Sequence, residues 1–298
     1  MSSTTQFALS PEQESTVTQF FYRQFFITPR PVGAHEVNVV GKTAIVTGSN
    51  CGIGLECASQ LLDLGVGKLI LAVRSVKSGE DAKLKIASQR AESAIMIEVW
   101  KLDMSDYDSI IAFSKRAEGL ARLDIVILNA GVRKPTQVFN ASTGYEEDIQ
   151  VNFLSTFLLL VRLLPIIKAK RQGSEPGRIT LVSSDSARVA QLEERNESPM
   201  LPAFKKSRAD FNIAEQYNNN LTRLYGRSAA VGAHVIVHAT LKSGSESHGH
   251  CIGDCEMKSM ARLVYTEEGA ALSQSLWEEL MSEFSFAGVR EIMLGLAE

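Results

Sequence analysis

The sequence has few cysteines: four among 298 residues, at positions 51, 57, 251 and 255. Thiols that are so few and so unevenly spaced do not suit a disulfide framework, so we expect a reducing, cytoplasmic environment. Cys251 and Cys255 stand near His248 and His250, which are possible zinc ligands. The sequence offers no second pair of such ligands, and a solvated loop that enters a strand is the simpler interpretation. We therefore predict no metal site.

An excess of charge of one sign is also missing. Lys and Arg number 31 and Asp and Glu number 34, which gives a net charge of −3 and a pI near 6.0. Such a balance provides no positive field for nucleic acid or for an anionic membrane surface. We expect the partner to be a small molecule.

Apolar runs long enough to span a membrane are absent too. The longest candidate, residues 157–167, contains Arg162 and Pro165. The first residues are polar and lack the basic start and apolar core of a signal peptide. We therefore expect a soluble, intracellular protein.

The chain does have a glycine-rich stretch, T-G-S-N-C-G-I-G at residues 47–54. It follows the apolar run of residues 43–46 and precedes a helical pattern through Leu55, Ala58 and Leu61. A buried strand that runs into such a turn and then into a helix leaves free backbone N–H groups pointing at one spot. That spot suits a pyrophosphate group.

Each glycine of this stretch has a separate use. Gly48 permits the tight turn, Gly52 lets the backbone approach phosphate groups without a Cβ between them, and Gly54 allows close packing of helix on strand. Together with Asn50 and Ile53, they form the predicted cofactor-binding turn. A structural turn without a ligand is the alternative, but strand and helix patterns in register favour binding.

The spacing T-G-x-x-x-G-x-G resembles that of the short-chain dehydrogenase/reductase family, rather than the G-x-G-x-x-G of the general dinucleotide fingerprint. The resemblance covers residues 41 to about 280. It implies a nicotinamide cofactor on an α/β fold, a Rossmann-type doubly wound parallel sheet in three α/β/α layers. We expect one such domain over residues 41–298, after an N-terminal helix and linker over residues 1–40.

Strand and helix patterns alternate after residue 41. Strands are predicted over residues 43–46, 68–73, 95–102, 123–128, 178–184 and 233–237. After the last of these, the family continues with a proline-glycine loop and a helical segment that walls the substrate pocket. Both are missing here, and residues 247–252 already resemble the family's last strand. The sheet is therefore expected to be shortened after the sixth strand.

The resemblance assigns two residues to the adenosine half of the cofactor. Arg74 stands where an arginine pairs with the 2′-phosphate, which favours NADP(H) over NAD(H); an ordinary surface arginine is the alternative. Asp103 matches the acid that accepts a hydrogen bond from the adenine amino group, and this role is compatible with capping the next helix.

Four more residues are assigned to the nicotinamide half. Asn129 and Gly131 belong to an N-A-G triplet that passes beneath the cofactor in the family. Asn152, in a long helical pattern over residues 145–168, matches the asparagine that orders a water in the proton relay; a hydrogen bond that stabilises a kink is the alternative. Ser184 falls at the position of the substrate-binding serine.

The motif that carries the family's chemistry is altered. The family places Tyr-x-x-x-Lys on a helix, where the tyrosine transfers a proton and the lysine lowers its pKa and holds the nicotinamide ribose. Phe211 and Glu215 occupy these positions here. Phenylalanine has no proton to give, and the carboxylate reverses the local field. His238, expected at the end of a strand, is a weaker candidate for the acid than for a structural residue.

Helices are predicted at both ends of the chain. Ser10 and Gln13 form a capping box around Pro11, and the apolar residues that follow give one helix an aromatic face. Leaders of this kind occur on fungal members of the family. A C-terminal helix is predicted over residues 266–286, and a homodimer through such helices is plausible.

Two functions remain open from the sequence. One is an NADP(H)-dependent oxidoreductase that acts on a ketone or alcohol of a small, secondary-metabolic compound, with an unusual proton donor. The other is a protein of the same fold that transfers no hydride, either a cyclase or isomerase or a cofactor-binding pseudoenzyme or partner subunit. The altered motif favours the protein that transfers no hydride. The usual activity of the family favours the oxidoreductase.

Overall fold

The computed structural model describes residues 7–90, 96–173, 175–207 and 226–297. Five parallel strands form its central sheet in the order β3-β2-β1-β4-β5. The strands are β1 (Thr43–Thr47), β2 (Lys68–Val73), β3 (Met96–Lys101), β4 (Ile125–Leu128) and β5 (Arg178–Leu181). The strand order reverses between β1 and β4, and in sheets of this kind ligands bind outside the carboxyl ends of the strands at such a point.

The central strands are buried along almost their whole length because helices cover both faces of the sheet. All five residues of β1 and all four of β4 are buried. In β2 only Lys68, at the start, is partly exposed. This pattern is typical of a parallel sheet, and it confirms the predicted three-layer α/β/α fold.

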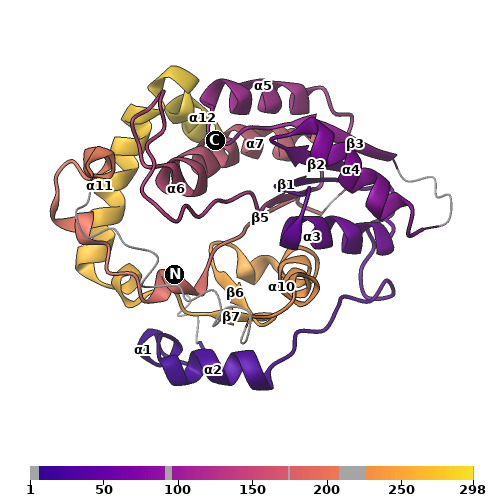
Figure 1. Cartoon of the computed structure of the whole chain (residues 1–298), viewed down its shortest axis with the longest axis horizontal. Helices are drawn as coiled ribbons and strands as arrows, with labels where there is room; N and C mark the ends of the chain where they lie inside the picture. The colour runs from indigo at the N-terminus through magenta and orange to yellow at the C-terminus, as the bar shows by residue number, and fades with distance from the viewer. Residues whose placement is uncertain (1–6, 91–95, 174, 208–225, 298) are drawn as a thin grey trace.

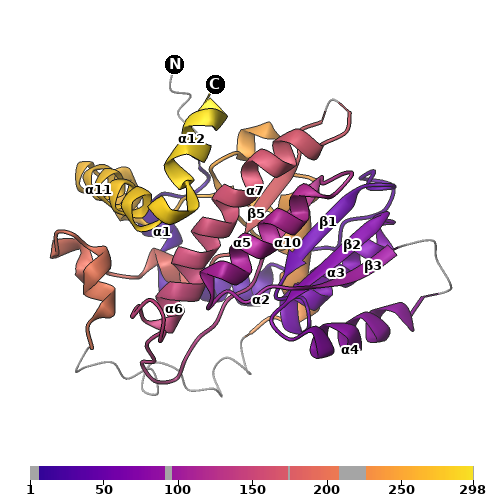
Figure 2. The ribbon, with the colours of Figure 1, turned by 90° about the horizontal axis from the view of Figure 1, so that it is seen from above.

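Helices form the two outer layers (Figure 1). The helices of the sheet region are α3 (Gly52–Asp63), α4 (Val76–Ala87), α5 (Tyr107–Glu118), α6 (Glu147–Ile149), α7 (Thr156–Lys170) and α10 (Ala229–Leu241). On one face, Leu61 of α3, Ile86 of α4 and Val237 of α10 share a buried cluster with β1 and β2. On the other face, Phe113 of α5 and Leu158 of α7 belong to a second cluster. Figure 2 shows α5 and α7 running side by side across the sheet.

One long helix is apolar because it lies in the core. A π-helical turn, Gln150–Ser155, joins α6 and α7 into a continuous helical stretch over Glu147–Lys170. By length and composition alone this stretch could cross a membrane, and half of its most apolar window is buried inside the fold. Leu158, Leu159 and Leu163 have no exposed surface. Packing against the sheet accounts for its apolarity.

The predicted sixth strand is wrong. Residues 233–237 lie within α10, whose N-terminus is capped by the Ser228 hydroxyl, 3.3 Å from the N–H of Val231. A short apolar run does not distinguish a strand from a buried helix, and this helix is held on both sides. Gln60 Nε2 of α3 donates to the carbonyl of Ala230 at 3.1 Å, and the Thr240 hydroxyl donates to Thr180 Oγ1 of β5 at 2.9 Å.

The predicted last strand does not join the central sheet. Within residues 247–252, only the end is extended, as β6 (Cys251–Gly253), which pairs with β7 (Glu256–Lys258) in a separate antiparallel hairpin. Asp254 and Cys255 form its turn with φ of 52° and 67°. β5 also ends at Leu181, three residues before the predicted Ser184.

The N-terminal segment forms two helices rather than the predicted single one. The capping box of Ser10 and Gln13 is present and starts α1 (Pro11–Glu14), but α2 (Val17–Phe26) begins anew with Thr16 as its cap. Figure 1 shows both helices beside the β6–β7 hairpin, away from the central sheet. We call this segment, residues 7–40, the leader.

The predicted C-terminal helix is confirmed as α11 (Glu267–Glu283), capped by the Thr266 hydroxyl, 3.0 Å from the N–H of Gly269. A further helix, α12 (Val289–Ala297), follows it. Short 3₁₀ turns lie at Asp185–Arg188, Glu193–Asn196, Leu201–Lys205, Ser245–Ser247, Arg262–Tyr265 and Ser285–Ala287.

The end of α11 is fixed by one buried ring. Phe284 has no exposed surface, and its ring lies 5.3 Å from that of Tyr107 and 5.9 Å from that of Phe157, between ring centroids. We expect Phe284→Ala to lower the free energy of unfolding by about 3–5 kcal/mol in urea denaturation, because it leaves a cavity. Phe286 also stacks on Tyr107 but is 57% exposed, so Phe286→Ala should cost less than about 1 kcal/mol. Equal losses would contradict the docking of α11 on the core.

Candidate functional site

The glycine-rich turn lies at the carboxyl end of β1, where the sheet order reverses. Gly48 has a φ of +64°, and a Cβ on it would lie 2.9 Å from the Cα of Ala130. A Cβ on Gly54 would overlap the Asn129 side-chain nitrogen and the carbonyl oxygen of Gly48. Both positions therefore require glycine, for the reasons predicted. Gly52 has a φ of +58° and open space beside it.

The N-terminus of α3 has no side chain to cap it. Cys51 is the N-cap residue and makes no side-chain hydrogen bond to the helix. The first N–H groups of a helix have no intrahelical partner, and the helix dipole adds positive potential at the same place. The turn from Gly48 to Gly52 therefore offers backbone donors to an anion.

Thr47 fastens this turn to the end of β4. Its hydroxyl accepts hydrogen bonds from the N–H groups of Asn129 and Ala130, both at 2.9 Å. In return, Asn129 Nδ2 donates to the carbonyl of Thr47 at 3.0 Å. The N-A-G triplet is thereby held directly against the glycine-rich turn.

Asn152 lies in the π-helical turn, and its side chain binds the backbone that follows the triplet. Its Oδ1 accepts from the N–H of Val132, and its Nδ2 donates to the carbonyl of Val132, both at 2.8 Å. A Cβ on Gly131 would lie 3.1 Å from Asn152 Oδ1, so this position is tight as well. The predicted water-ordering role of Asn152 stays a prediction, and its side chain joins the helix to the triplet.

Arg74 and Asp103 follow the neighbouring strands β2 and β3. Arg74 is exposed, and its guanidinium makes no hydrogen bond or ion pair within the described part of the chain; its carbonyl accepts from Lys101 Nζ at 2.6 Å. Asp103 is partly exposed, and one carboxylate oxygen accepts the N–H of Ser105 at 3.1 Å. Both residues follow the carboxyl ends of their strands, at the edge of the sheet where the turn lies, and their contacts with the cofactor stay predictions.

Ser184 lies just beyond β5 and is exposed. Its hydroxyl is 2.6 Å from that of Ser186 and accepts the N–H of Ser186 at 3.2 Å, as the cap of the 3₁₀ turn Asp185–Arg188. Phe211 and Glu215 lie outside the described residues.

Among the described residues, Tyr145 and Lys205 are engaged elsewhere, and His238 lies in a helix. Tyr145 is buried and donates to Glu283 at 2.9 Å, and burial together with that carboxylate raises the pKa of the phenol far above its usual value. Lys205 lies over the Tyr145 ring, 4.1 Å from its centre. His238 lies in α10 rather than at a strand end, and burial lowers its pKa, which favours the neutral ring at pH 7.

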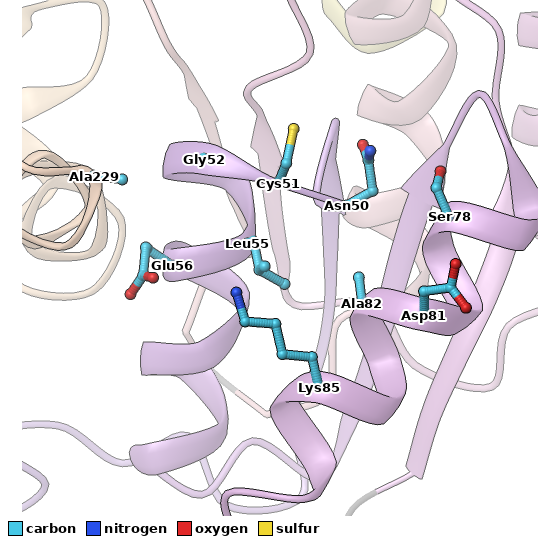
Figure 3. Close-up of a pocket in the computed structure, with 10 residues that line it drawn as sticks. All are labelled: Asn50, Cys51, Gly52, Leu55, Glu56, Ser78, Asp81, Ala82, Lys85 and Ala229. Atoms are coloured by element: carbon cyan, nitrogen blue, oxygen red, sulfur yellow. The ribbon is translucent and has the colours of Figure 1, made fainter.

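A cleft of about 390 Å³ opens beside the turn. Figure 3 shows Asn50, Cys51 and Gly52 at its rim, and it continues between α3 and α4, where Glu56 and Lys85 face it. Ser78, Asp81 and Ala229 also line it. Within the described ranges, no three His, Cys, Asp or Glu side chains gather as metal ligands would.

Sequence reasoning missed the charged groups that meet the loop after β5. Asp185, next to Ser184, pairs with Arg23 of the leader at 3.2 Å and also with Arg188. Nothing in the local pattern of either segment indicates the pairing of Arg23 with Asp185, since they are 162 positions apart. The one signal in the sequence was an arginine, Arg23, among the aromatic residues of the predicted N-terminal helix.

Comparison with known proteins agrees with this geometry. Residues 42–194 match the family described as short chain dehydrogenase. The chain is 42% identical to the short-chain dehydrogenase fogG of Aspergillus ruber, over 98% of this chain and 99% of that protein. It is 37% identical to the short chain dehydrogenase/reductase mfmJ of Annulohypoxylon moriforme, over 92% and 93% of the two chains.

A solved structure supports the fold. An uncharacterized protein from Mycobacterium paratuberculosis superposes with a TM-score of 0.54 at 22% identity, over 85% of this chain and 97% of that one.

The alignment with fogG spans 345 positions, more than the 298 residues of this chain, so that relative contains internal stretches with no counterpart here.

The close approach at Gly54 can be tested by adding one methyl group. We expect Gly54→Ala to weaken NADPH binding by more than tenfold, followed by nucleotide fluorescence, because the methyl group pushes α3 away from Gly48 and Asn129. Gly295→Ala is the control, since Gly295 lies in α12 and a Cβ on it would meet no atom within 4 Å. If both variants bind NADPH like the parent, the turn is not the binding site.

Proposed function

Because the chain belongs to the short-chain dehydrogenase family, we propose that it is an NADP(H)-dependent oxidoreductase. Its substrate would be a ketone or alcohol of a small, secondary-metabolic compound. One observation carries the proposal: an uncapped helix N-terminus and two obligatory glycines meet the end of β4, which Thr47 holds in place. The reaction class is supported by fungal relatives that are named short-chain dehydrogenases and that align over nearly their full length.

The residues present fit a nicotinamide dinucleotide. The backbone of Gly48, Asn50, Gly52, Ile53 and Gly54 would bind its pyrophosphate, as at other helix N-termini that close a Rossmann turn. When bound, the cofactor supplies or accepts the hydride. Asp103 would accept from the adenine, and Asn129 and Gly131 would lie beneath the cofactor.

Arg74 supports NADP(H) rather than NAD(H). An exposed guanidinium without an ionic partner among the described residues suits the 2′-phosphate, which an arginine can bind with two hydrogen bonds. An acid at this position would instead repel that phosphate and accept from a ribose hydroxyl.

We predict that Arg74→Asp reverses this preference. The Kd for NADPH should rise about 100-fold, and the Kd for NADH should stay within threefold of the parent, because only NADPH carries the phosphate. Arg171→Asp is the matched control: it makes the same charge change at an exposed arginine near the start of β4, at the opposite edge of the sheet. Equal effects of both substitutions would mean that Arg74 acts through net charge alone.

The reacting end is assigned to Ser184 and Asn152, with Phe211 and Glu215 in place of the family's tyrosine and lysine. Without the tyrosine, the proton must come from another group or from water. Because Phe211 replaces the tyrosine, a non-redox reaction, either a cyclisation or an isomerisation, is the competing function that the next experiment must distinguish.

The double variant Phe211→Tyr with Glu215→Lys tests these positions. With a panel of ketones, we expect NADPH oxidation to rise about 10²–10⁴-fold, the usual contribution of a positioned acid. Either single substitution should give much less, because tyrosine and lysine act together. If the parent binds NADPH but neither it nor the double variant oxidises it, the oxidoreductase proposal fails and a non-redox function is favoured.

A further inference from the structure

A group of charged side chains joins the leader to the loop that carries Ser184. Its members come from the leader, the loop after β5, the segment before α10 and the β6–β7 hairpin. We call it the leader cluster, and it consists of Glu14, Arg23, Asp185, Arg227, Asp254 and Lys258. Glu14, Arg23 and Lys258 are no more than 6% exposed. Charges buried to this extent need close partners, because the loss of hydration is costly.

Arg23 is the centre of the cluster. Its Nη1 pairs with Glu14, its Nη2 donates to Asp185 Oδ2 at 3.2 Å, and its Nε lies 3.6 Å from Asp254 Oδ2. One guanidinium thus meets carboxylates from three separate segments. A lysine could not do this, since its ammonium lacks the planar fork.

The hairpin side of the cluster is held by a second arginine. Arg227 Nη1 donates to Asp254 Oδ1 at 2.7 Å, so both oxygens of that carboxylate are bound. Its Nη2 donates to the carbonyls of Arg23 and Ile27 at 2.7 and 3.0 Å, which caps the end of α2. On the far side, Lys258 lies 3.6 Å from Glu14 Oε1. The leader is therefore fixed relative to the hairpin.

The loop side reaches Ser184 through its neighbour. Asp185 is bound by Arg23 at Oδ2 and by Arg188 at Oδ1. Arg188 is itself anchored, because its Nε donates to the carbonyl of Ser259 at 3.1 Å. Asp185 opens the 3₁₀ turn that Ser184 caps. The first residue of the turn that Ser184 caps is thus held from two sides, by Arg23 and by Arg188.

We propose that Arg23 is a positioning residue, which holds Ser184 at the carboxyl end of β5 through Asp185. The inference rests on the proposed function, in which Ser184 binds the substrate carbonyl or hydroxyl. It makes the leader a part of the substrate site, although the leader lies outside the sheet. The cofactor turn, at β1 and β4, has no contact with this cluster among the described residues.

A double-mutant cycle tests the coupling. Arg23→Lys keeps the positive charge that Glu14 and Asp254 need but loses the fork, and Asp185→Asn keeps the shape of the side chain but loses its charge. The substrate is a ketone from the panel that the parent reduces. We expect each substitution to raise the KM for this ketone at least tenfold, with kcat and the Kd for NADPH changed less than threefold. The double variant should be no worse than either single one, because both break the same contact.

Glu256→Gln is the matched control, since Glu256 pairs with Lys258 at 3.0 Å, is 68% exposed in its side chain and does not meet the loop. It should leave the KM unchanged. Asp185→Glu should restore part of the parent KM, which a general loss of stability would not. Additive effects of Arg23→Lys and Asp185→Asn, or an equal rise with Glu256→Gln, would overturn the inference.

A second readout does not depend on turnover. In hydrogen–deuterium exchange followed by mass spectrometry, the amides of residues 184–190 should exchange at least tenfold faster in Arg23→Lys and Asp185→Asn than in the parent or Glu256→Gln. Faster exchange in both variants, together with a parent that oxidises no NADPH, would support the positioning of the loop and reject the proposed function. Unchanged exchange would overturn the inference even if the parent is an active reductase.

Discussion

The binding end of this protein depends on how closely the start of α3 approaches the ends of β1 and β4. At Gly54 a hydrogen atom is all that fits beside Gly48 and Asn129. The helix can therefore begin directly against the sheet, and its unpaired N–H groups converge on the turn. Thr47 keeps β4 in register with this turn by accepting two N–H groups at one hydroxyl. An anion site thus arises from backbone groups, without a charged side chain at its centre.

The leader, by contrast, is held by charged side chains rather than by backbone groups. Arg23 and Glu14 are nearly removed from water, and the attraction between such charges seldom repays the loss of hydration. Replacing buried ion pairs of this kind by apolar residues of similar size is often neutral or stabilising. What the ions add is direction, since a guanidinium bonds only along its N–H groups and so fixes the segments that it joins. This is the physical basis for assigning the leader a positioning role.

The sequence predicted the elements whose formation is local. The predicted bounds of β2 agree with the structure to the residue. A short apolar run, bounded by Gly67 and Arg74, is typical of a buried strand. The capping signals of Ser10 and Thr266 were also read correctly, since each acts within one helical turn. Residues 233–237 were assigned wrongly because their apolar pattern suits a strand and a buried helix alike, and the hydrogen bonds that decide for the helix come from distant residues. The same limit hid the pairing of Arg23 with Asp185.

This difference in range explains how one half of the chain can keep the family pattern while the other departs from it. The cofactor turn is assembled from residues 43–131, where the contacts join β1, the start of α3 and the end of β4. The loop at Ser184 is held by residues from the leader and from the hairpin near residue 254, so no short motif describes it. We therefore propose that nucleotide binding and substrate binding are physically separable in this fold, and that substrate binding depends on segments outside the family motif.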